Sequence, residues 1–180
     1  MKFTKSAQLI KPLLLTFIAA SLIVGCGNSK KKLGDKIAKL EAVEILDAEQ
    51  KKELAAAYFD YANEAPEDSI SRPYLFRAAE YFREMEQYEQ LIACCDTFLN
   101  RYPKTYEANL LLFTKSRGLH RLGKTQEAIL EMKRFNKLKS HLTSEELSHY
   151  GVLYQDYIEK NPNDSLTPQY MLELANVMSA

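Results

Sequence analysis

One arrangement of residues occurs twice between Tyr74 and Ser140, at a constant spacing of 37 residues, and it restricts the fold more than any other feature of the chain. Six pairs follow this spacing: Ala79 and Ser116, Phe82 and Leu119, Leu91 and Ala128, Cys95 and Met132, Phe98 and Phe135, and Pro103 and Ser140. A constant period of this size is typical of stacked helix pairs, because each pair buries its apolar face only against its neighbours. The spacing therefore predicts an all-α domain of helix-turn-helix repeats.

Apolar residues three and four positions apart indicate where the helices lie. The predicted helices cover about 37–46, 48–65, 71–85 after a cap at Ser69 or Ser71, 88–102 before Pro103, 143–160 behind a capping box of Thr143 and Glu146, and a short last segment from Thr167-Pro168. A second self-match relates residues 58–69 to residues 154–165. Its offset of 96 residues is not a multiple of 37, so the register of the last repeat stays open.

The unit between Leu75 and Pro103 resembles the tetratricopeptide repeat. The likeness rests on Leu75-x2-Ala78-Ala79-x2-Phe82, on Leu91-x3-Cys95 and on the closing Pro103. It implies helix pairs stacked into a short right-handed superhelix over roughly residues 34–178, with the small Ala79 allowing close approach of two helices. Lys115 and Ser140 depart from the pattern, because the family has an apolar residue and a proline at these positions.

The first 25 residues have the features of a secretory signal. Lys2, Lys5 and Lys11 precede an apolar run over 13–24, which is shorter than the ~20 residues of a membrane-spanning helix. The ending Leu22-Ile23-Val24-Gly25-Cys26 resembles the bacterial lipobox, which implies cleavage before Cys26 and covalent lipid, palmitate included, on that residue. The chemistry requires a cysteine, because a thiolate is the nucleophile that takes the lipid. The alternative is an uncleaved anchor, or an ordinary signal followed by a chance cysteine.

After the signal peptide, residues 1–25, the sequence predicts a lipidated flexible tether over 26–33 and a repeat domain over 34–180. More than one acyl chain would attach the protein stably without a spanning helix. Gly27 rather than an aspartate follows Cys26, which in lipoproteins favours the outer membrane. No acidic cluster follows to indicate surface export, so the periplasmic face is expected.

The chain as a whole is similar to bacterial envelope lipoproteins with these repeats, such as BamD-like proteins of β-barrel assembly and the repeat domain associated with the Tol-Pal system. The likeness is carried by a Pro-x-Asp-Ser start, a Tyr-Leu-Phe-Arg-Ala-Ala helix and the close Arg101-Tyr102-Pro103. It implies a non-catalytic scaffold that binds envelope proteins or peptides. The alternative is a periplasmic binding module for peptidoglycan, glycan or another small ligand.

The inner curve of such a superhelix is the surface that these repeats use for binding. The residues predicted to face it lie on the first helix of each pair and avoid the apolar stripe: Phe76, Glu80, Arg83, Phe113, Arg117, His120 and Arg121. Aromatic rings beside arginines would anchor a peptide or an acidic tail. The alternative is a solvated face with both phenylalanines packed between repeats.

Charge is distributed unevenly along the chain. Residues 115–139 hold eight basic and two acidic side chains, whereas residues 41–68 hold nine acidic and two basic ones. We therefore expect an electrically polar molecule. A chain beginning at Cys26 has a net charge of −3, which gives no reason to bind nucleic acid.

The sequence has no glycine-rich phosphate loop and no G-x-S-x-G motif, and no catalytic residue or cofactor is predicted beyond the lipid on Cys26. His141, Glu145 and His149 have a spacing that could hold a metal, but His141 precedes the capping Thr143 and is expected outside the helix. A metal site is therefore not predicted.

Two cysteines, Cys94 and Cys95, are neighbours in a predicted helix and cannot easily reach disulfide geometry. Cys95 falls on the apolar stripe and is expected in the core, with Cys94 partly exposed. A redox role is the alternative, because free thiols are unusual in an oxidising compartment.

Overall fold

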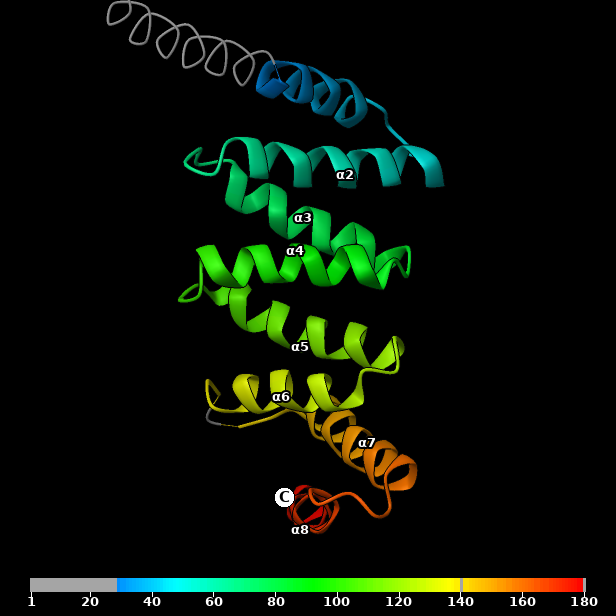
Figure 1. Cartoon of the computed structure of the whole chain (residues 1–180). Helices are drawn as coiled ribbons and strands as arrows, with labels where there is room; N and C mark the ends of the chain where they lie inside the picture. Colours follow the sequence, from blue (N-terminus) through cyan, green and yellow to red (C-terminus); the bar gives the residue numbers. More distant parts are fainter. Residues whose placement is uncertain (1–28, 140, 180) are drawn as a thin grey trace, which may run out of the picture. The chain divides into compact units, whose positions relative to one another are not determined.

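The computed structural model describes residues 29–139 and 141–179, which form helices and turns without a β-strand (Figure 1). The all-α prediction is confirmed for these residues. The predicted signal peptide, Cys26 and Ser140 lie outside them. Within the same ranges, no helix has the length and apolar character needed to cross a membrane. The chain divides into two compact units, Met1–Ser71 and Arg72–Ala180.

The first unit contains a helix over residues 29–41 and helix α2, Ala48–Glu64. A hydrogen bond from the Tyr58 hydroxyl to Glu41, 2.5 Å long, joins the two helices. Residues 29–33, expected to be a flexible tether, are helical. The helix predicted to run through Leu46 ends at residue 41, and Asp47 caps α2 and forms a capping box with Gln50.

The second unit contains six helices in the described ranges, of which the first begins with the last residue of the first unit. They are α3 (Ser71–Glu84), α4 (Tyr88–Arg101), α5 (Tyr106–Arg121), α6 (Thr125–Asn136), α7 (Ser144–Lys160) and α8 (Thr167–Met178). From α4 to α8, each helix packs against the next one along the chain. The predicted capping box at Thr143 and the predicted ends at Lys160 and Thr167 are confirmed.

The 37-residue period is visible in the turns that reverse the chain. The Gln87 N–H donates to the Phe82 carbonyl, and 37 residues later the Lys124 N–H donates to the Leu119 carbonyl, both over 2.9 Å. The residue before each donor has a positive φ, 56° at Glu86 and 74° at Gly123. The sequence period therefore corresponds to one turn geometry used twice.

The second self-match, with an offset of 96 residues, corresponds to a different and longer connection. Before α3, the Ser71 hydroxyl donates to the Ala65 carbonyl, and before α8, the Thr167 hydroxyl donates to the Asn161 carbonyl, each over 2.5 Å. Gly151 lies where α7 meets α8, with Leu174 and Val177 within 3.9 Å of the position that a Cβ there would take. The α7 and α8 helices thus form a close pair joined by the longer connection, and the 96-residue match corresponds to this connection.

One expectation about burial needs correction. Cys94 is fully buried, like Cys95, because α4 is packed against both α3 and α5. Burial also raises the pKa of the Cys95 thiol well above its usual value, which makes the thiol unreactive.

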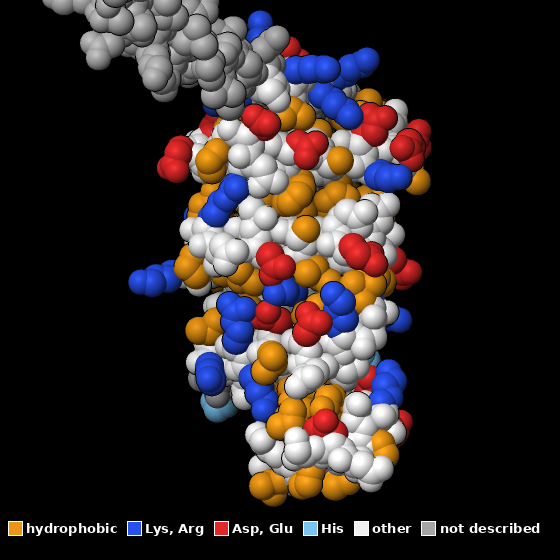
Figure 2. Space-filling model, viewed as in Figure 1, with side chains coloured by type: hydrophobic (Ala, Val, Ile, Leu, Met, Phe, Trp, Pro, Cys, Tyr) orange, Lys and Arg blue, Asp and Glu red, His pale blue; other side chains and the backbone are white. Residues whose placement is uncertain are grey.

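At the C-terminal end of the second unit, apolar side chains gather over the outer face of α8 (Figure 2). Met171, Leu172 and Met178 are exposed there.

The two reversal turns predict opposite effects of two glycine substitutions. Glu86→Gly should raise the free energy of unfolding by about 0.5–1 kcal/mol, because glycine adopts a positive φ without a steric penalty. Gly123→Ala should lower it by about 1 kcal/mol, although space around Gly123 is open. Urea denaturation measures both. Glu84→Gly is the control and should destabilise α3; a stabilising effect there would contradict the turn-specific explanation.

Candidate functional site

A hollow of about 430 Å³ opens between α3, α4 and α5, within the second unit. It is lined by Phe76, Glu80, Arg83, Glu86, Tyr88, Leu91, Leu110, Phe113, Thr114, Arg117, Gly118 and Arg121. Six of the seven residues predicted for the binding surface are among them. His120 is the exception, because it faces Asp156 of α7, with 3.6 Å between Nε2 and the carboxylate.

Helical spacing explains why the six residues converge. Positions 76, 80 and 83 lie on one face of α3, and positions 113, 117 and 121 lie on one face of α5. The α5 helix approaches α4 closely at Gly118, where Leu91 Cδ2 is only 3.1 Å from the position of a Cβ. A larger residue at 118 would push Leu91 away from the base of the hollow.

The two phenylalanines both pack and line the hollow. Phe76 meets Phe98 edge to face at 6.4 Å between ring centroids, and Phe113 stacks on Phe135 at 5.6 Å. In each pair, a phenylalanine of the first helix therefore packs against a phenylalanine of the second helix. The two contacts are related by the 37-residue period. Both rings remain partly exposed. The two sequence interpretations, packed rings and binding anchors, thus describe two faces of the same side chains.

The arginines of the hollow differ in their partners. Arg83 pairs with Glu80 at 3.1 Å, and Arg117 pairs with Glu145 of α7 at 2.9 Å while lying 5.7 Å from the centre of the Phe113 ring. Arg121 is exposed and has no ion pair within the residues described.

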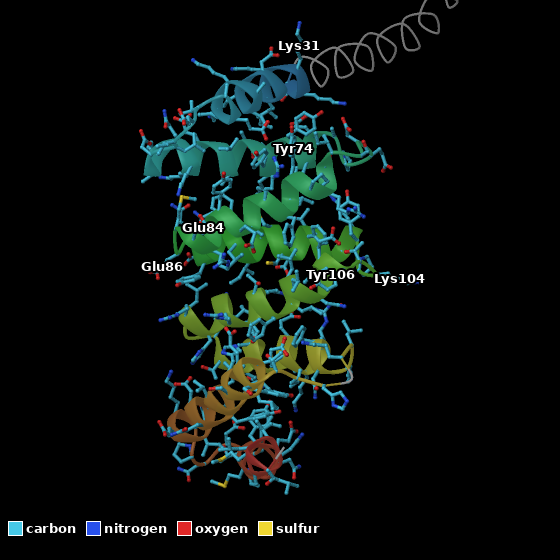
Figure 3. All side chains as sticks on the ribbon, turned by 180° about the vertical axis from the view of Figure 1, so that it is seen from behind. Lys31, Tyr74, Glu84, Glu86, Lys104 and Tyr106 are labelled. Atoms are coloured by element: carbon cyan, nitrogen blue, oxygen red, sulfur yellow. The ribbon has the colours of Figure 1, made fainter. Side chains whose placement is uncertain are left out.

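The ends of the two helices that flank the hollow can be followed in Figure 3. It shows Glu84 and Glu86 at one end of α3, and Tyr106, at the start of α5, at the other end of these helices.

Much of the predicted positive charge of residues 115–139 is neutralised by neighbouring helices. Lys133 pairs with Glu173 of α8 at 2.9 Å, Lys139 with Glu146 of α7 at 2.6 Å, and Arg117 with Glu145 of α7 at 2.9 Å. Figure 2 accordingly shows basic and acidic side chains interspersed over this unit. Counting charges along the sequence overestimated the field, because the pairing acids come from α7 and α8.

Lys115, which departs from the repeat pattern, forms ion pairs with acids of two other helices. Its Nζ lies 2.6 Å from Asp96 of α4 and 2.6 Å from Glu131 of α6. The Lys115 and Glu131 side chains are each only 11% exposed. Burial opposes the charge of Lys115, but the hydrogen bonds from Lys115 to Asp96 and Glu131 outweigh it and raise the pKa of Lys115. A charge therefore replaces the expected apolar contact between α4, α5 and α6.

A polar cluster that the sequence did not reveal lies between α5, α6 and α7. The buried Ser116 hydroxyl donates to the Ala128 carbonyl over 2.9 Å and lies 3.1 Å from His149 Nε2. Because that hydroxyl is buried and already donates to a carbonyl, it links helices instead of presenting a nucleophile. Asp156 accepts from Thr125 of α6 over 2.5 Å. In the sequence, Asp156 is marked only by its place in the repeated Tyr-x-Asp-Tyr sequence.

The spacing of His141, Glu145 and His149 does not produce a metal site in the structure. His141 lies in the turn before α7, Glu145 binds Arg117, and His149 faces Ser116. Across residues 29–139 and 141–179, no three His, Cys, Asp or Glu side chains are grouped as metal ligands.

Comparisons with protein-family models, with curated proteins and with solved structures found no match to this chain. Function must therefore be argued from the geometry.

The buried ion pair leads to a prediction about paired substitutions. Lys115→Met should lower the free energy of unfolding by about 3 kcal/mol, because Glu131 is left nearly buried with only Arg134 beside it. The double variant Lys115→Met/Glu131→Met should recover most of this loss, since no unpaired buried charge remains. Urea denaturation measures both, with the exposed Lys124→Met as control. A double variant less stable than the single one would contradict the prediction.

Proposed function

We propose that this protein is a non-catalytic adaptor, lipid-anchored in the bacterial envelope, whose helical repeats bind a segment of a partner protein in the hollow between α3 and α5. The observation that carries the proposal is the composition of that hollow. Partly exposed aromatic rings and arginines from two successive repeats converge on one surface. Aromatic and arginine side chains are the residue types that dominate protein interfaces energetically.

The repeat architecture supports this role. Successive helices pack against each other, and the reversal turn recurs after 37 residues, as expected for tetratricopeptide-like repeats. Repeats of this kind, stacked into a short right-handed superhelix, present the first helices of successive pairs along one concave surface. The hollow lies between two such first helices, α3 and α5.

The hollow favours a particular partner chemistry. Phe76, Leu110 and Phe113 offer apolar contacts to an aromatic or aliphatic side chain. Arg121 has no acidic partner in the described ranges, and Arg83 and Arg117 can exchange theirs for a carboxylate of the ligand. We therefore expect a segment in which an apolar residue lies close to one or more acidic residues.

The membrane attachment in this proposal rests on the sequence before the repeats. The lipobox-like ending at Cys26 would place the domain on a lipid tether, most simply at the periplasmic face of the outer membrane. Cys26→Ser should abolish lipidation and move the protein from the membrane to the soluble fraction. Mass spectrometry of the purified protein checks this, and an unmodified Cys26 in the wild type would contradict it.

A second candidate function is the binding of a small ligand such as a peptidoglycan or glycan fragment. The volume of the hollow, about 430 Å³, is in the range of small-molecule sites, roughly 300–1,000 Å³. Its aromatic faces could stack on a sugar ring. The adaptor is preferred because the lining extends over two repeats and three helices, as a protein segment would require.

Affinity capture from cross-linked, detergent-solubilised envelopes tests the proposal. The triple variant Arg83→Ala/Arg117→Ala/Arg121→Ala should lose a protein partner that the wild type retains. A matched control, Lys104→Ala/Lys124→Ala/Lys137→Ala, removes three exposed positive charges outside the hollow and should keep the partner. Loss in both variants would indicate a general charge effect. Recovery of glycan fragments without a protein would favour the second candidate.

A further inference from the structure

The α7 and α8 helices join the rest of the second unit through a seam that is rich in polar contacts. The contact of α6 with α7 is less extensive than those of α5 with α6 and of α7 with α8. The seam is held by Arg117–Glu145, Ser116–His149, His120–Asp156, Thr125–Asp156 and Lys133–Glu173. Besides the buried Tyr150, Leu153, Tyr154 and Tyr157 of α7, the strength of the seam therefore depends on the charges of these few side chains.

His149 lies at the centre of this seam and fits there as a neutral ring. The Ser116 hydroxyl donates a hydrogen bond to the Ala128 carbonyl, so Ser116 Oγ accepts a hydrogen bond from His149 Nε2–H. The imidazole meets the Phe113 ring edge to face at 5.5 Å and lies 6.0 Å from the His120 ring. The pocket around His149 thus combines apolar and hydrogen-bonding contacts.

The charged groups around His149 do not offer it a free counterion. On α5, it faces Arg117 and His120, both bases. On α7, Glu145 is held by Arg117, and Asp156 is held by Thr125 of α6 and by Lys160. On α8, Glu173 binds Lys133 and accepts from the Tyr154 hydroxyl. A proton on His149 would therefore add a positive charge beside the Arg117 guanidinium, with no unpaired carboxylate to balance it.

Burial, together with His120 and Arg117, lowers the pKa of His149 from 6.5 to about 4. When α7 leaves the seam, the ring becomes solvated and its pKa returns toward 6.5. Between these values the released state binds more protons than the docked state, so docking weakens as the pH falls below 6.5. Burial opposes ionisation of Asp156 and Glu173, but their hydrogen bonds outweigh it and lower the pKa of both carboxyls, so the acids stay charged in this window.

We propose that protonation of His149 loosens the seam, releasing α7 with α8 from α5 and withdrawing Glu145 from Arg117 at the edge of the hollow. The exposure of Arg117 and Phe113 to a ligand is then controlled by the position of α7. This consequence for binding rests on the proposed function of the hollow, whereas the loosening itself does not.

Amide hydrogen exchange of the purified full chain in detergent tests the loosening without any partner. After correction for intrinsic exchange rates, opening of residues 144–178 relative to residues 88–101 should increase on the order of tenfold from pH 7 to pH 5. In His149→Gln this increase should disappear, because the glutamine amide can donate to Ser116 but does not titrate. In the control His141→Gln, an exposed residue before α7, the increase should remain.

A direct titration of the wild-type protein tests the proposal even if the His149→Gln variant folds poorly. The NMR signals of the His149 ring in the wild type should titrate well below pH 6.5. Titration near 6.5, or an exchange response that is absent in the wild type or persists in His149→Gln, would overturn the proposal. Since neither measurement uses a ligand, failure to capture a partner would count against the proposed function and leave this inference standing.

Discussion

The structure of the second unit depends on how the chain reverses between α3 and α4 and between α5 and α6. At Glu86 and at Gly123 a positive φ and a hydrogen bond back to the preceding helix turn the chain by the same route. Because the route is the same, α4 returns with Phe98 against Phe76, and α6 returns with Phe135 against Phe113. The remaining faces of α3 and α5 are then left side by side, and the hollow lies between them.

Electrostatic pairing between helices gives the unit a second level of organisation. Lys115 joins acids of α4 and α6 in a nearly buried position, where the favourable energy of the pairs must offset the desolvation of each charge. Nearer the C-terminal end, exposed or partly exposed pairs join α5 and α6 to α7 and α8. Exposed pairs contribute little stability, about 0–1 kcal/mol each, so these ion pairs can rearrange at small cost.

The same side chains connect the hollow to this weaker seam. Arg117 lines the hollow, lies over the Phe113 ring and binds Glu145 of α7. A ligand carboxylate would have to compete with Glu145 for Arg117, so binding and the docking of α7 are thermodynamically linked. Such linkage is reciprocal: a ligand that prefers free Arg117 also favours release of α7.

The sequence by itself determined most of the helices, the capping box at Thr143 and the 37-residue period, because these follow from local spacing of apolar and capping residues. It also placed six of the twelve residues that line the hollow on a common surface, since helical geometry alone puts 76, 80, 83, 113, 117 and 121 on outward faces. Only the tertiary structure decided that Cys94 is buried, that Lys115 has two acidic partners and that His120 faces Asp156. The physical reason is that burial and charge pairing at these positions depend on other helices, whose side chains are distant in the sequence and follow no local period.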